Sequence, residues 1–273
     1  MAPAPAEIPR AARLTATVIA RDEEDRLPVT LESLRFADEI IVVVDAASTD
    51  RTEAIAREFG ARVLVRPFDG FGAQKNAAQD VAEGPWILSV DADESVSPEL
   101  AVEIRARLLE LASGGVEPIP AAFRIPIRLE FLGRALRFGR DTVVRPVRLF
   151  HGDHARFSLD PIHEKVVVRG TVDALDEFIL HRSYRDLSHY MEKLDLYTTL
   201  GAEAKLKSGR TGTRLLGLRV LWEFFDRCFL RLGILDGSPG LTFAALSTAN
   251  TLLKYLKLRE RISKGAEAAR GPE

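Results

Sequence analysis

The sequence has 273 residues, of which 46% are hydrophobic and 29% are charged, and its formal net charge is −2. A chain of this length holds one large α/β domain with an appendage, or two small domains, and either can bury a substantial core. The balanced charge provides no positive field for a polyanion, so nucleic acid is a poor candidate partner. The single cysteine, Cys228, excludes a disulfide framework and a thiolate metal cluster and fits a reducing compartment.

Residues 1–13 are rich in alanine and proline and contain no apolar run of the kind found in signal peptides or membrane spans. We therefore expect a disordered tail over residues 1–13.

From residue 14 to about residue 111, apolar strand-like runs alternate with helix-like segments. We expect strands over Leu14–Ala20, Glu39–Val44, Arg62–Val65 and Trp86–Val90. We expect helices over Pro28–Arg35, from the capping residues Ser48–Asp50 to Phe59, after Gly70–Gly72, and over Pro98–Leu111. Such alternation is typical of βα units around a mainly parallel sheet. Residues 121–180 are instead β-rich, and residues 186–261 have a helical pattern.

Two carboxylates follow the apolar run Trp86–Val90, in the triplet Asp91-Ala92-Asp93. Ligands of open α/β sheets bind just beyond the carboxyl ends of the strands, where this triplet is expected. Mg²⁺ and Mn²⁺ prefer oxygen ligands, and Mg²⁺ is usually held by one or two carboxylates together with the phosphates of a substrate. An Asp-x-Asp triplet also occurs in plain solvated turns, so the surrounding motifs decide its meaning.

Polar residues follow two earlier strands as well, in Arg21-Asp22-Glu23-Glu24 and in the run from Asp45 to Asp50. Together with Asp91-Ala92-Asp93, their order and spacing resemble those of the inverting glycosyltransferases of family two, which have the GT-A fold and typically read N-E-E, D-D-G-S-x-D and D-x-D at these places. Asp22 and Ala46 depart from this pattern, which leaves Asp45 in place but makes the identity of the nucleotide less certain.

Further motifs are similar to those of the branch that contains the lipopolysaccharide-core β-glucosyltransferases, which add sugars to lipid-linked oligosaccharides. These motifs are Gly70-Phe71-Gly72, Gln74-Lys75, Arg148-Leu149-Phe150, His163-Glu164, Ser183-Tyr184-Arg185-Asp186 and Leu235-Asp236-Gly237. The resemblance implies a Rossmann-like, mainly parallel sheet with helices on both faces and a helical C-terminal extension. We expect a glycosyltransferase domain over residues 14–185, with a nucleotide-binding half at 14–115 and an acceptor half at 116–185, followed by a helical region over 186–273.

The resemblance also implies roles for single residues in binding a nucleotide-sugar donor. Asp45 is expected to contact the uracil or ribose, and Glu23 and the backbone of Arg21 the nucleoside pocket. A divalent cation, Mg²⁺ or Mn²⁺, would bridge the diphosphate and be held by Asp93, with Asp91 acting directly or through the ribose.

Lys75 is a candidate for neutralising the phosphate as a point charge. Arg145 and Arg148 are candidates for binding the diphosphate or an anionic acceptor, although arginines in β-rich segments are often simply exposed.

Inversion in a single displacement needs a base that takes the proton of the attacking hydroxyl. An Asp or Glu side chain usually serves as this base. Glu164 occupies the position of that acidic residue in the family, and His163 beside it could orient the carboxylate or approach the metal. A lone His-Glu pair is more often structural, and Asp160 and Asp141 remain rival bases.

The segment 218–232 predicts one apolar helical face, formed by Leu218, Leu221, Trp222, Phe225, Cys228, Phe229 and Leu232. The charged residues on its other face exclude a transmembrane span. Such a stripe more often packs against its own domain, but with arginines on the polar face it also suits peripheral contact with a membrane.

The preferred hypothesis is a metal-dependent inverting glycosyltransferase that moves a hexose from a UDP-sugar to a lipid-linked saccharide at the cytoplasmic face of the inner membrane. The preferred hexose is glucose, with UDP-glucose as the donor. One alternative is a nucleotidyltransferase that makes sugar nucleotides, although residues 20–25 contain no glycine for a phosphate-binding loop. The other is a membrane-associated scaffold with a silent nucleotide site. The donor sugar, the acceptor and the linkage depend on pocket contacts that the sequence does not predict.

Overall fold

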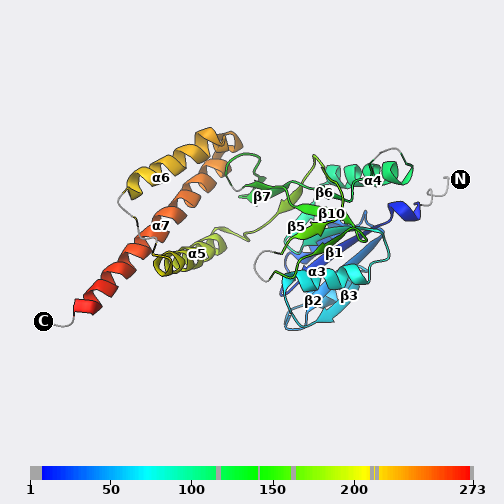
Figure 1. Cartoon of the computed structure of the whole chain (residues 1–273), viewed down its shortest axis with the longest axis horizontal. Coiled ribbons are helices and arrows are strands. Elements are labelled where there is room, and N and C mark those ends of the chain that lie inside the picture. Colours follow the sequence, from blue (N-terminus) through cyan, green and yellow to red (C-terminus); the bar gives the residue numbers. More distant parts are fainter. Residues whose placement is uncertain are drawn as a thin grey trace. The chain divides into compact units, whose positions relative to one another are not determined.

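The computed structural model describes residues 8–114, 118–140, 142–160, 164–209, 212 and 215–270. Two units make up the chain (Figure 1). The first unit comprises Met1–Arg128 and Val144–His181, and the second comprises Leu129–Val143 and Arg182–Glu273. The segment Leu129–Val143 therefore belongs with the C-terminal helices.

A seven-stranded sheet forms the centre of the first unit. Its strands, in spatial order, are β13 (Val172–Ala174), β6 (Ala122–Arg124), β10 (Val147–His151), β4 (Trp86–Asp91), β1 (Leu14–Ala20), β2 (Glu39–Asp45) and β3 (Arg62–Arg66). The pairs β4–β1, β1–β2 and β2–β3 are parallel, whereas β10 runs antiparallel to both β4 and β6. This mainly parallel sheet confirms the predicted α/β fold class.

Helices cover both faces of the sheet, as expected from alternation of side chains along each strand. They are α1 (Leu27–Ser33), α2 (Thr52–Glu58), α3 (Phe71–Asp80) and α4 (Pro98–Ala112), after a short 3-10 turn, η1 (Arg10–Ala12). Val42 and Val44 join a cluster with residues of α1, α2 and α4, whereas Ile41 and Val43 pack with Ala78 of α3. The strand β2 is thus buried on both faces, which explains its uninterrupted apolar run.

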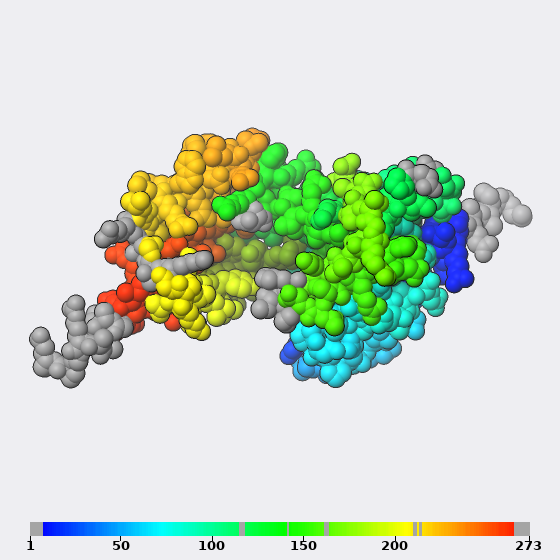
Figure 2. All heavy atoms as spheres, viewed as in Figure 1, coloured from blue at the N-terminus to red at the C-terminus, as the bar shows by residue number. Residues whose placement is uncertain are grey.

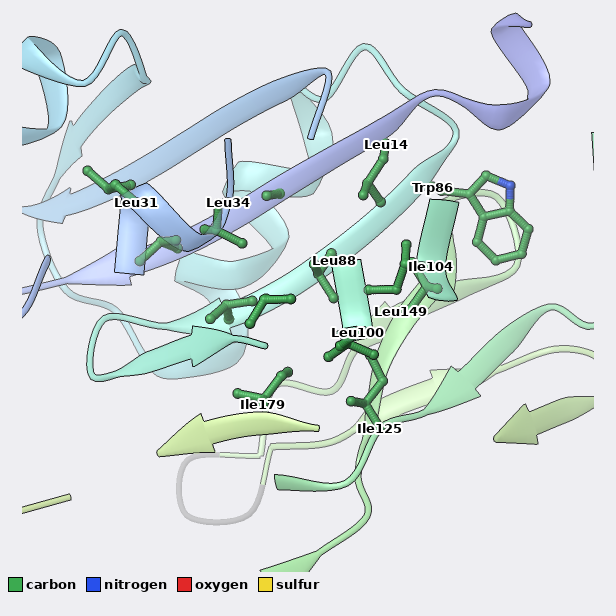
Figure 3. Close-up of a cluster of buried hydrophobic side chains, with 14 of the residues drawn as sticks. Leu14, Leu31, Leu34, Trp86, Leu88, Leu100, Ile104, Ile125, Leu149 and Ile179 are labelled. Atoms are coloured by element: carbon green, nitrogen blue, oxygen red, sulfur yellow. The ribbon is translucent and has the colours of Figure 1, made fainter. Parts of the chain in front are cut away.

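The main core lies between this sheet and the helices α1 and α4 (Figure 3). Leu14, Leu88, Leu31, Leu100 and Ile104 are fully buried there. Each such side chain stabilises the fold by about 1.5–3 kcal/mol relative to an exposed one. The core therefore fixes the strands firmly and, with them, the polar residues at their carboxyl ends.

Two small strand pairs complete the first unit. β5 (Glu94–Val96) pairs antiparallel with β14 (Ile179–His181), which places His181 opposite Glu94. β11 (Ala155–Phe157) pairs antiparallel with β12 (Val166–Val168), and Glu164 lies in the connection between them. Sequence-distant residues thereby reach the edge of the sheet where β4 ends.

The chain passes between the units within β7 (Ile127–Phe131), within β9 (Val143–Val144), and after His181. In the second unit β7 forms a hairpin with β8 (Arg134–Ala135). The helices are α5 (Leu187–Lys207), α6 (Leu216–Phe225) and α7 (Gly237–Arg270), with a π-helical turn, η2 (Asp226–Leu230), and a 3-10 turn, η3 (Gly233–Asp236), before α7.

Phe131, Tyr190, Leu194 and Phe243 form part of the core of this unit. Among the described residues, no helix combines the length and the hydrophobicity that crossing a bilayer requires.

The predicted helical face over residues 218–232 is wrong in its second half. The N–H of Arg231 donates to the carbonyl of Asp226, five residues earlier, so the chain makes a wider π turn that shifts the side-chain positions. Cys228 is buried, whereas Trp222 and Phe229 are 61% and 50% exposed. The aromatic stripe therefore does not pack into the core of its own unit.

Candidate functional site

The carboxyl ends of β1, β2 and β4 line a cavity of about 430 Å³ in the first unit. This is the position at which open α/β sheets bind ligands. The predicted site residues found along its lining are Arg21, Glu23, Asp45, Lys75, Asp91, Asp93 and Glu164. The sequence also predicted His163 as a metal ligand and Asp141 as a rival base, and both lie outside the described residues.

Asp91 is held by two cations, one on each carboxylate oxygen. The Nζ of Lys75 lies 3.1 Å from its Oδ1, and the Nη2 of Arg148 lies 2.7 Å from its Oδ2. Burial opposes ionisation of Asp91, but the charges of Arg148 and Lys75 outweigh it and hold the pKa of this carboxyl well below its usual range. Asp91 is therefore a carboxylate at neutral pH.

Arg148 joins Asp91 to a second, fully buried acid. Its Nη2 also lies 2.7 Å from the Oε1 of Glu94, whose Oε2 accepts the backbone N–H of Asp91 at 2.9 Å. Burial raises the pKa of Glu94, the charge of Asp91 raises it further, and Arg148 opposes both. Because its guanidinium points at these acids and its side chain is only 10% exposed, Arg148 orients Asp91.

Asp93 contacts two basic side chains through its Oδ2. The Nη1 of Arg26 lies 3.3 Å away and the Nε2 of His181 lies 3.2 Å away. Arg26 also donates two hydrogen bonds to Glu23, at 2.6 and 2.7 Å. Burial lowers the pKa of His181, but the hydrogen bond and charge of Asp93 outweigh it, so the pKa lies above its ordinary value.

Asp45 and Arg21 form the part of the lining at the ends of β1 and β2. Asp45 is 6% exposed, accepts the backbone N–H of Ala47 at 3.0 Å, and lies 3.4 Å from the Nη1 of Arg21. Phe68 and Phe71 line the same cavity, and their rings meet edge to face with centroids 5.0 Å apart. This side of the cavity thus combines a fixed carboxylate with half-exposed aromatic rings.

The ends of β1 and β2 are held together by Asp22, which departs from the family pattern, and by Asp50. Asp22, at a positive φ of 52°, accepts the backbone N–H of Thr49 at 2.8 Å. Asp50 accepts the backbone N–H groups of Thr52 and Glu24 at 2.9 Å each. Asp50 thus accepts the N–H of the first residue of α2, although Arg51 and not Asp50 occupies the N-cap position.

Glu164 reaches the cavity from the β11–β12 connection. Its Oε1 lies 3.3 Å from the Nζ of Lys75, and Lys75 is 93% buried beneath it, with its ammonium 5.2 Å from the centroid of the Phe157 ring. The rival base Asp160 is exposed and is not among the described residues that line the cavity. Lys75 therefore bridges Asp91 and Glu164 inside one pocket.

The arrangement can bind an anionic, hydroxyl-rich ligand beside a carboxylate that accepts a proton. Fixed carboxylates accept hydrogen bonds from sugar hydroxyls or a base N–H, and the ammonium of Lys75 neutralises phosphate oxygens. Sequence reasoning missed His181 and the ring pair Phe68–Phe71. A lone histidine in a short strand gave no signal, since only the β5–β14 pairing brings it to Asp93.

Comparison with known proteins agrees with this chemistry. Residues 15–116 match the family described as Glycosyl transferase family 2. A glycosyltransferase of Rickettsia bellii is 26% identical over 262 residues, which cover 91% of this chain and 86% of that protein. The lipopolysaccharide core biosynthesis glycosyltransferase LpsC of Rhizobium meliloti is 28% identical over 265 residues, 91% of this chain and 96% of that protein.

Among solved structures, S. aureus TarS in complex with UDP-GlcNAc is 16% identical with a TM-score of 0.41, over 64% of this chain and 59% of that chain. This likeness is too low to carry an argument about substrate or mechanism. The chain thus contains a glycosyl transferase family 2 domain over residues 15–116. This domain, with the glycosyltransferases that align over nine-tenths of the chain's length, identifies the chain as a glycosyltransferase.

Proposed function

We propose that the protein is a metal-dependent inverting glycosyltransferase that moves a hexose, in the first instance glucose, from a UDP-sugar to a lipid-linked saccharide such as lipopolysaccharide core. The observation that carries the proposal is the convergence of the predicted residues on one cavity, with Lys75 between Asp91 and Glu164. The acceptor class is supported by the relative LpsC, whose name assigns it to lipopolysaccharide core biosynthesis.

The donor nucleoside would bind at the side of the cavity formed by Asp45, Arg21 and Glu23. The buried carboxylate of Asp45 is fixed by the N–H of Ala47, so it is preorganised to accept hydrogen bonds from the base or ribose. Lys75 would turn its ammonium to the diphosphate, since a phosphate oxygen is a stronger competitor for a cation than a carboxylate that already has Arg148.

The charge balance of the cavity supports a divalent cation. Among the described lining residues, Glu23, Asp45, Asp91, Asp93 and Glu164 are acidic, whereas only Arg21 and Lys75 are basic. Adding the neighbours Glu94, Arg26 and Arg148 gives six acids against four cations, not counting His181. A diphosphate would add more negative charge, so its binding calls for a further cation.

Asp91 and Asp93 fit Mg²⁺ or Mn²⁺ as hard oxygen ligands. Within the described residues, no three histidine, cysteine or acidic side chains form a ready-made metal cluster. Two carboxylates are sufficient when the phosphates of a substrate complete the coordination, and His163 stays a predicted further ligand. The cation, when bound, stabilises the negative charge of the departing diphosphate.

Glu164 would accept the proton of the acceptor hydroxyl. Its carboxylate lines the cavity and is held in place by the ammonium of Lys75 at 3.3 Å. The carboxylate would take the hydroxyl proton as the acceptor oxygen bonds to the anomeric carbon and the bond to the diphosphate breaks. Attack opposite the departing diphosphate in this single displacement inverts the configuration. An enzyme with a lipid-linked acceptor would act at the cytoplasmic face of the inner membrane, in peripheral contact with it.

The direct test is a thermal-shift screen of UDP-, GDP-, ADP- and dTDP-sugars with and without Mn²⁺, followed by a transfer assay on the stabilising donor. A ligand that binds only the folded protein raises its apparent stability, by about 2.7 kcal/mol at a hundred times Kd. We expect UDP-sugars to stabilise the protein and Mn²⁺ to increase the effect. Stabilisation by another nucleotide alone would refute the UDP assignment, and pyrophosphate release from UTP with a sugar phosphate would favour the nucleotidyltransferase.

A further inference from the structure

The second unit carries a large exposed apolar ridge on α6, η2 and η3. We define the apolar ridge as Leu221, Trp222, Phe225, Phe229, Leu230 and Leu235, which are between 44% and 68% exposed. The rings of Trp222 and Phe225 have centroids 5.9 Å apart, and those of Phe225 and Phe229 5.1 Å apart. This segment is coloured yellow to orange in Figure 2. Contiguous exposed apolar patches of this kind mark interaction sites.

On the side of the same segment that faces its own unit, the side chains are buried and hydrogen-bonded within that unit. Arg227 is 8% exposed and Cys228 is buried. The guanidinium of Arg227 donates to Glu223 at 2.9 Å and to the backbone carbonyl of Arg140 at 3.2 Å. Because these inward contacts fix the segment, the apolar ridge cannot turn into the core of its unit without breaking them.

An arginine loop is anchored directly beside the apolar ridge. We define the arginine loop as residues 134–140, which expose the side chains of Arg134, Arg137 and Arg140. The buried carboxylate of Asp236 accepts the backbone N–H of Arg137 and that of Phe138, both at 2.9 Å. The loop is therefore held against η3 by its backbone, while Leu136 is buried and the three arginine side chains are exposed.

The N–H of Gly139 donates to the carbonyl of Arg231 at 2.7 Å, so the loop is also held where η2 ends. The turn at this place is tight. Leu232 has a φ of +58°, which an L side chain adopts only at a cost, and it is 46% exposed. A Cβ at Gly233 would lie 2.6 Å from the carbonyl oxygen of Arg227. The turn accordingly holds an apolar side chain outward at a strained position.

The exposed charges of this surface have one sign. The acids on the apolar segment are covered, since the side chains of Glu223 and Asp226 are only 16% and 15% exposed. The side chain of Arg231 is 58% exposed, and Arg219 is exposed as well. Together with the arginine loop, the apolar ridge therefore presents aromatic and aliphatic groups bordered by arginines.

We infer that the apolar ridge and the arginine loop form a docking surface for a bilayer that contains anionic phospholipids. Aromatic side chains favour the interface between headgroups and acyl chains, and arginines beside them pair with lipid phosphates. A second copy of the chain fits less well, because a symmetric contact would bring the arginine loops of both copies together. The inference rests on the proposed function in one respect only, the identity of the membrane that the enzyme contacts.

The test is flotation of the full chain with vesicles of phosphatidylglycerol and phosphatidylcholine, compared with vesicles of phosphatidylcholine alone. One variant neutralises the arginine loop, Arg134→Gln/Arg137→Gln/Arg140→Gln. Because a basic residue at an anionic surface contributes roughly fivefold in binding, the triple variant should bind roughly 100-fold more weakly. Its control, Arg51→Gln/Arg57→Gln/Arg62→Gln, removes the same charge from exposed positions of the first unit and should bind as wild type does.

A second variant, Leu221→Ser/Trp222→Ser, removes apolar side chains from the regular part of α6, and its control is Val102→Ser/Leu109→Ser at exposed positions of α4. We expect the first to lose binding by at least about tenfold and the control to keep it. Trp86 is 3% exposed, so the fluorescence shift on binding reports Trp222. Thermal unfolding and UDP-sugar stabilisation should match wild type in every variant, which separates docking from folding and from the donor site.

Failure of the wild type to float with anionic vesicles, or equal flotation of the triple variant, would overturn the inference. The inference would also be overturned if the wild type were a dimer that does not bind vesicles and if Leu221→Ser/Trp222→Ser converted this dimer to a monomer. The surface would then be an interface with a second copy of the chain. If the vesicle results are as expected but no UDP-sugar stabilises the protein, the proposed function fails and the docking surface stands.

Discussion

Replacing Arg148 by methionine should strongly destabilise the protein, because Arg148 is the cation shared by Asp91 and Glu94. Its Nη2 lies 2.7 Å from each carboxylate, and the Glu94 side chain is 2% exposed. In Arg148→Met, Asp91 keeps its ion pair with Lys75, whereas Glu94 loses its ion pair with Arg148. Removing one partner of a buried pair costs about 3–5 kcal/mol.

The reasoning is tested by adding Glu94→Gln to Arg148→Met. In wild type the backbone N–H of Asp91 donates to the Oε2 of Glu94 at 2.9 Å, and the amide oxygen of glutamine can accept the same hydrogen bond. The substitution also replaces the carboxyl group that has lost its cation by a neutral group. The double variant should therefore be more stable than Arg148→Met, although two residues have changed. Urea unfolding of wild type, both single variants and the double variant, at pH 7, gives the coupling free energy of the cycle.

Two results would contradict this account. A loss below about 1 kcal/mol in Arg148→Met would mean that water or Lys75 compensates the acids adequately. A double variant less stable than Arg148→Met would mean that Glu94 is stabilising for reasons other than this charge. In either case the buried network would not be what fixes Asp91.

Three further predictions test the site and the fold separately. Asp93→Ala should abolish transfer and Mn²⁺-dependent UDP-sugar stabilisation while the protein stays folded, and full activity in excess chelator would contradict the metal assignment. Glu164→Gln should keep donor affinity and lose roughly 10²–10⁴-fold in rate, whereas Asp160→Asn should be close to wild type; the reverse pattern would move the base to Asp160. Burial opposes ionisation of Asp38, but hydrogen bonds from Arg105 and a backbone N–H outweigh it and lower the pKa of Asp38 from its ordinary 3.8. The ionised carboxylate therefore stabilises the fold above that pH, and this stabilisation is lost as the pH falls through the lowered pKa. In urea unfolding, the free energy of unfolding of Asp38→Asn should accordingly depend less steeply on pH in that acid range than that of wild type.

The strands between residues 14 and 91 lie close to their predicted positions because their signals are local. Residues 40–44 form a continuous apolar run, and Leu14–Ala20 is apolar apart from Thr15 and Thr17, as is typical of strands buried on both faces. The polar residues after them stand at one edge of a parallel sheet by geometry alone, so Asp45 and Asp91 could be expected in the same cavity. The predicted helix start at Pro98 is likewise local, since Ser97 caps it by accepting the N–H of Leu100.

The parts that sequence reasoning missed depend on long-range pairing. His181 meets Asp93 across 88 positions and Arg148 meets Asp91 across 57, and both arrive on strands that run antiparallel to their neighbours. The sequence marked Arg148 as a candidate anion-binding residue but not as a partner of Asp91, and no local pattern marks His181. The break at residues 226–230 was missed for a different reason, since a π turn adds one residue without any change in hydrophobic composition. Exposure of the ring pair Phe68–Phe71 is likewise a property of the fold.

The charge network also distinguishes the two acids of the Asp-x-Asp triplet. Both oxygens of Asp91 are engaged by cations, whereas the contacts of Asp93 with Arg26 and His181 converge on its Oδ2. A metal ion can thus approach Asp93 with less rearrangement, while its approach to the Oδ1 of Asp91 requires that Lys75 leave.

A diphosphate that attracts Lys75 would uncover this oxygen and, in the same movement, release the Oε1 of Glu164 at the other side of the ammonium. Donor binding, completion of the cation site and exposure of the base would then be one event rather than three. In that arrangement Lys75→Met should weaken donor binding. It should also raise the rate of slow donor hydrolysis per bound donor, because the carboxylate of Glu164 would no longer be paired with the ammonium of Lys75 before the donor binds.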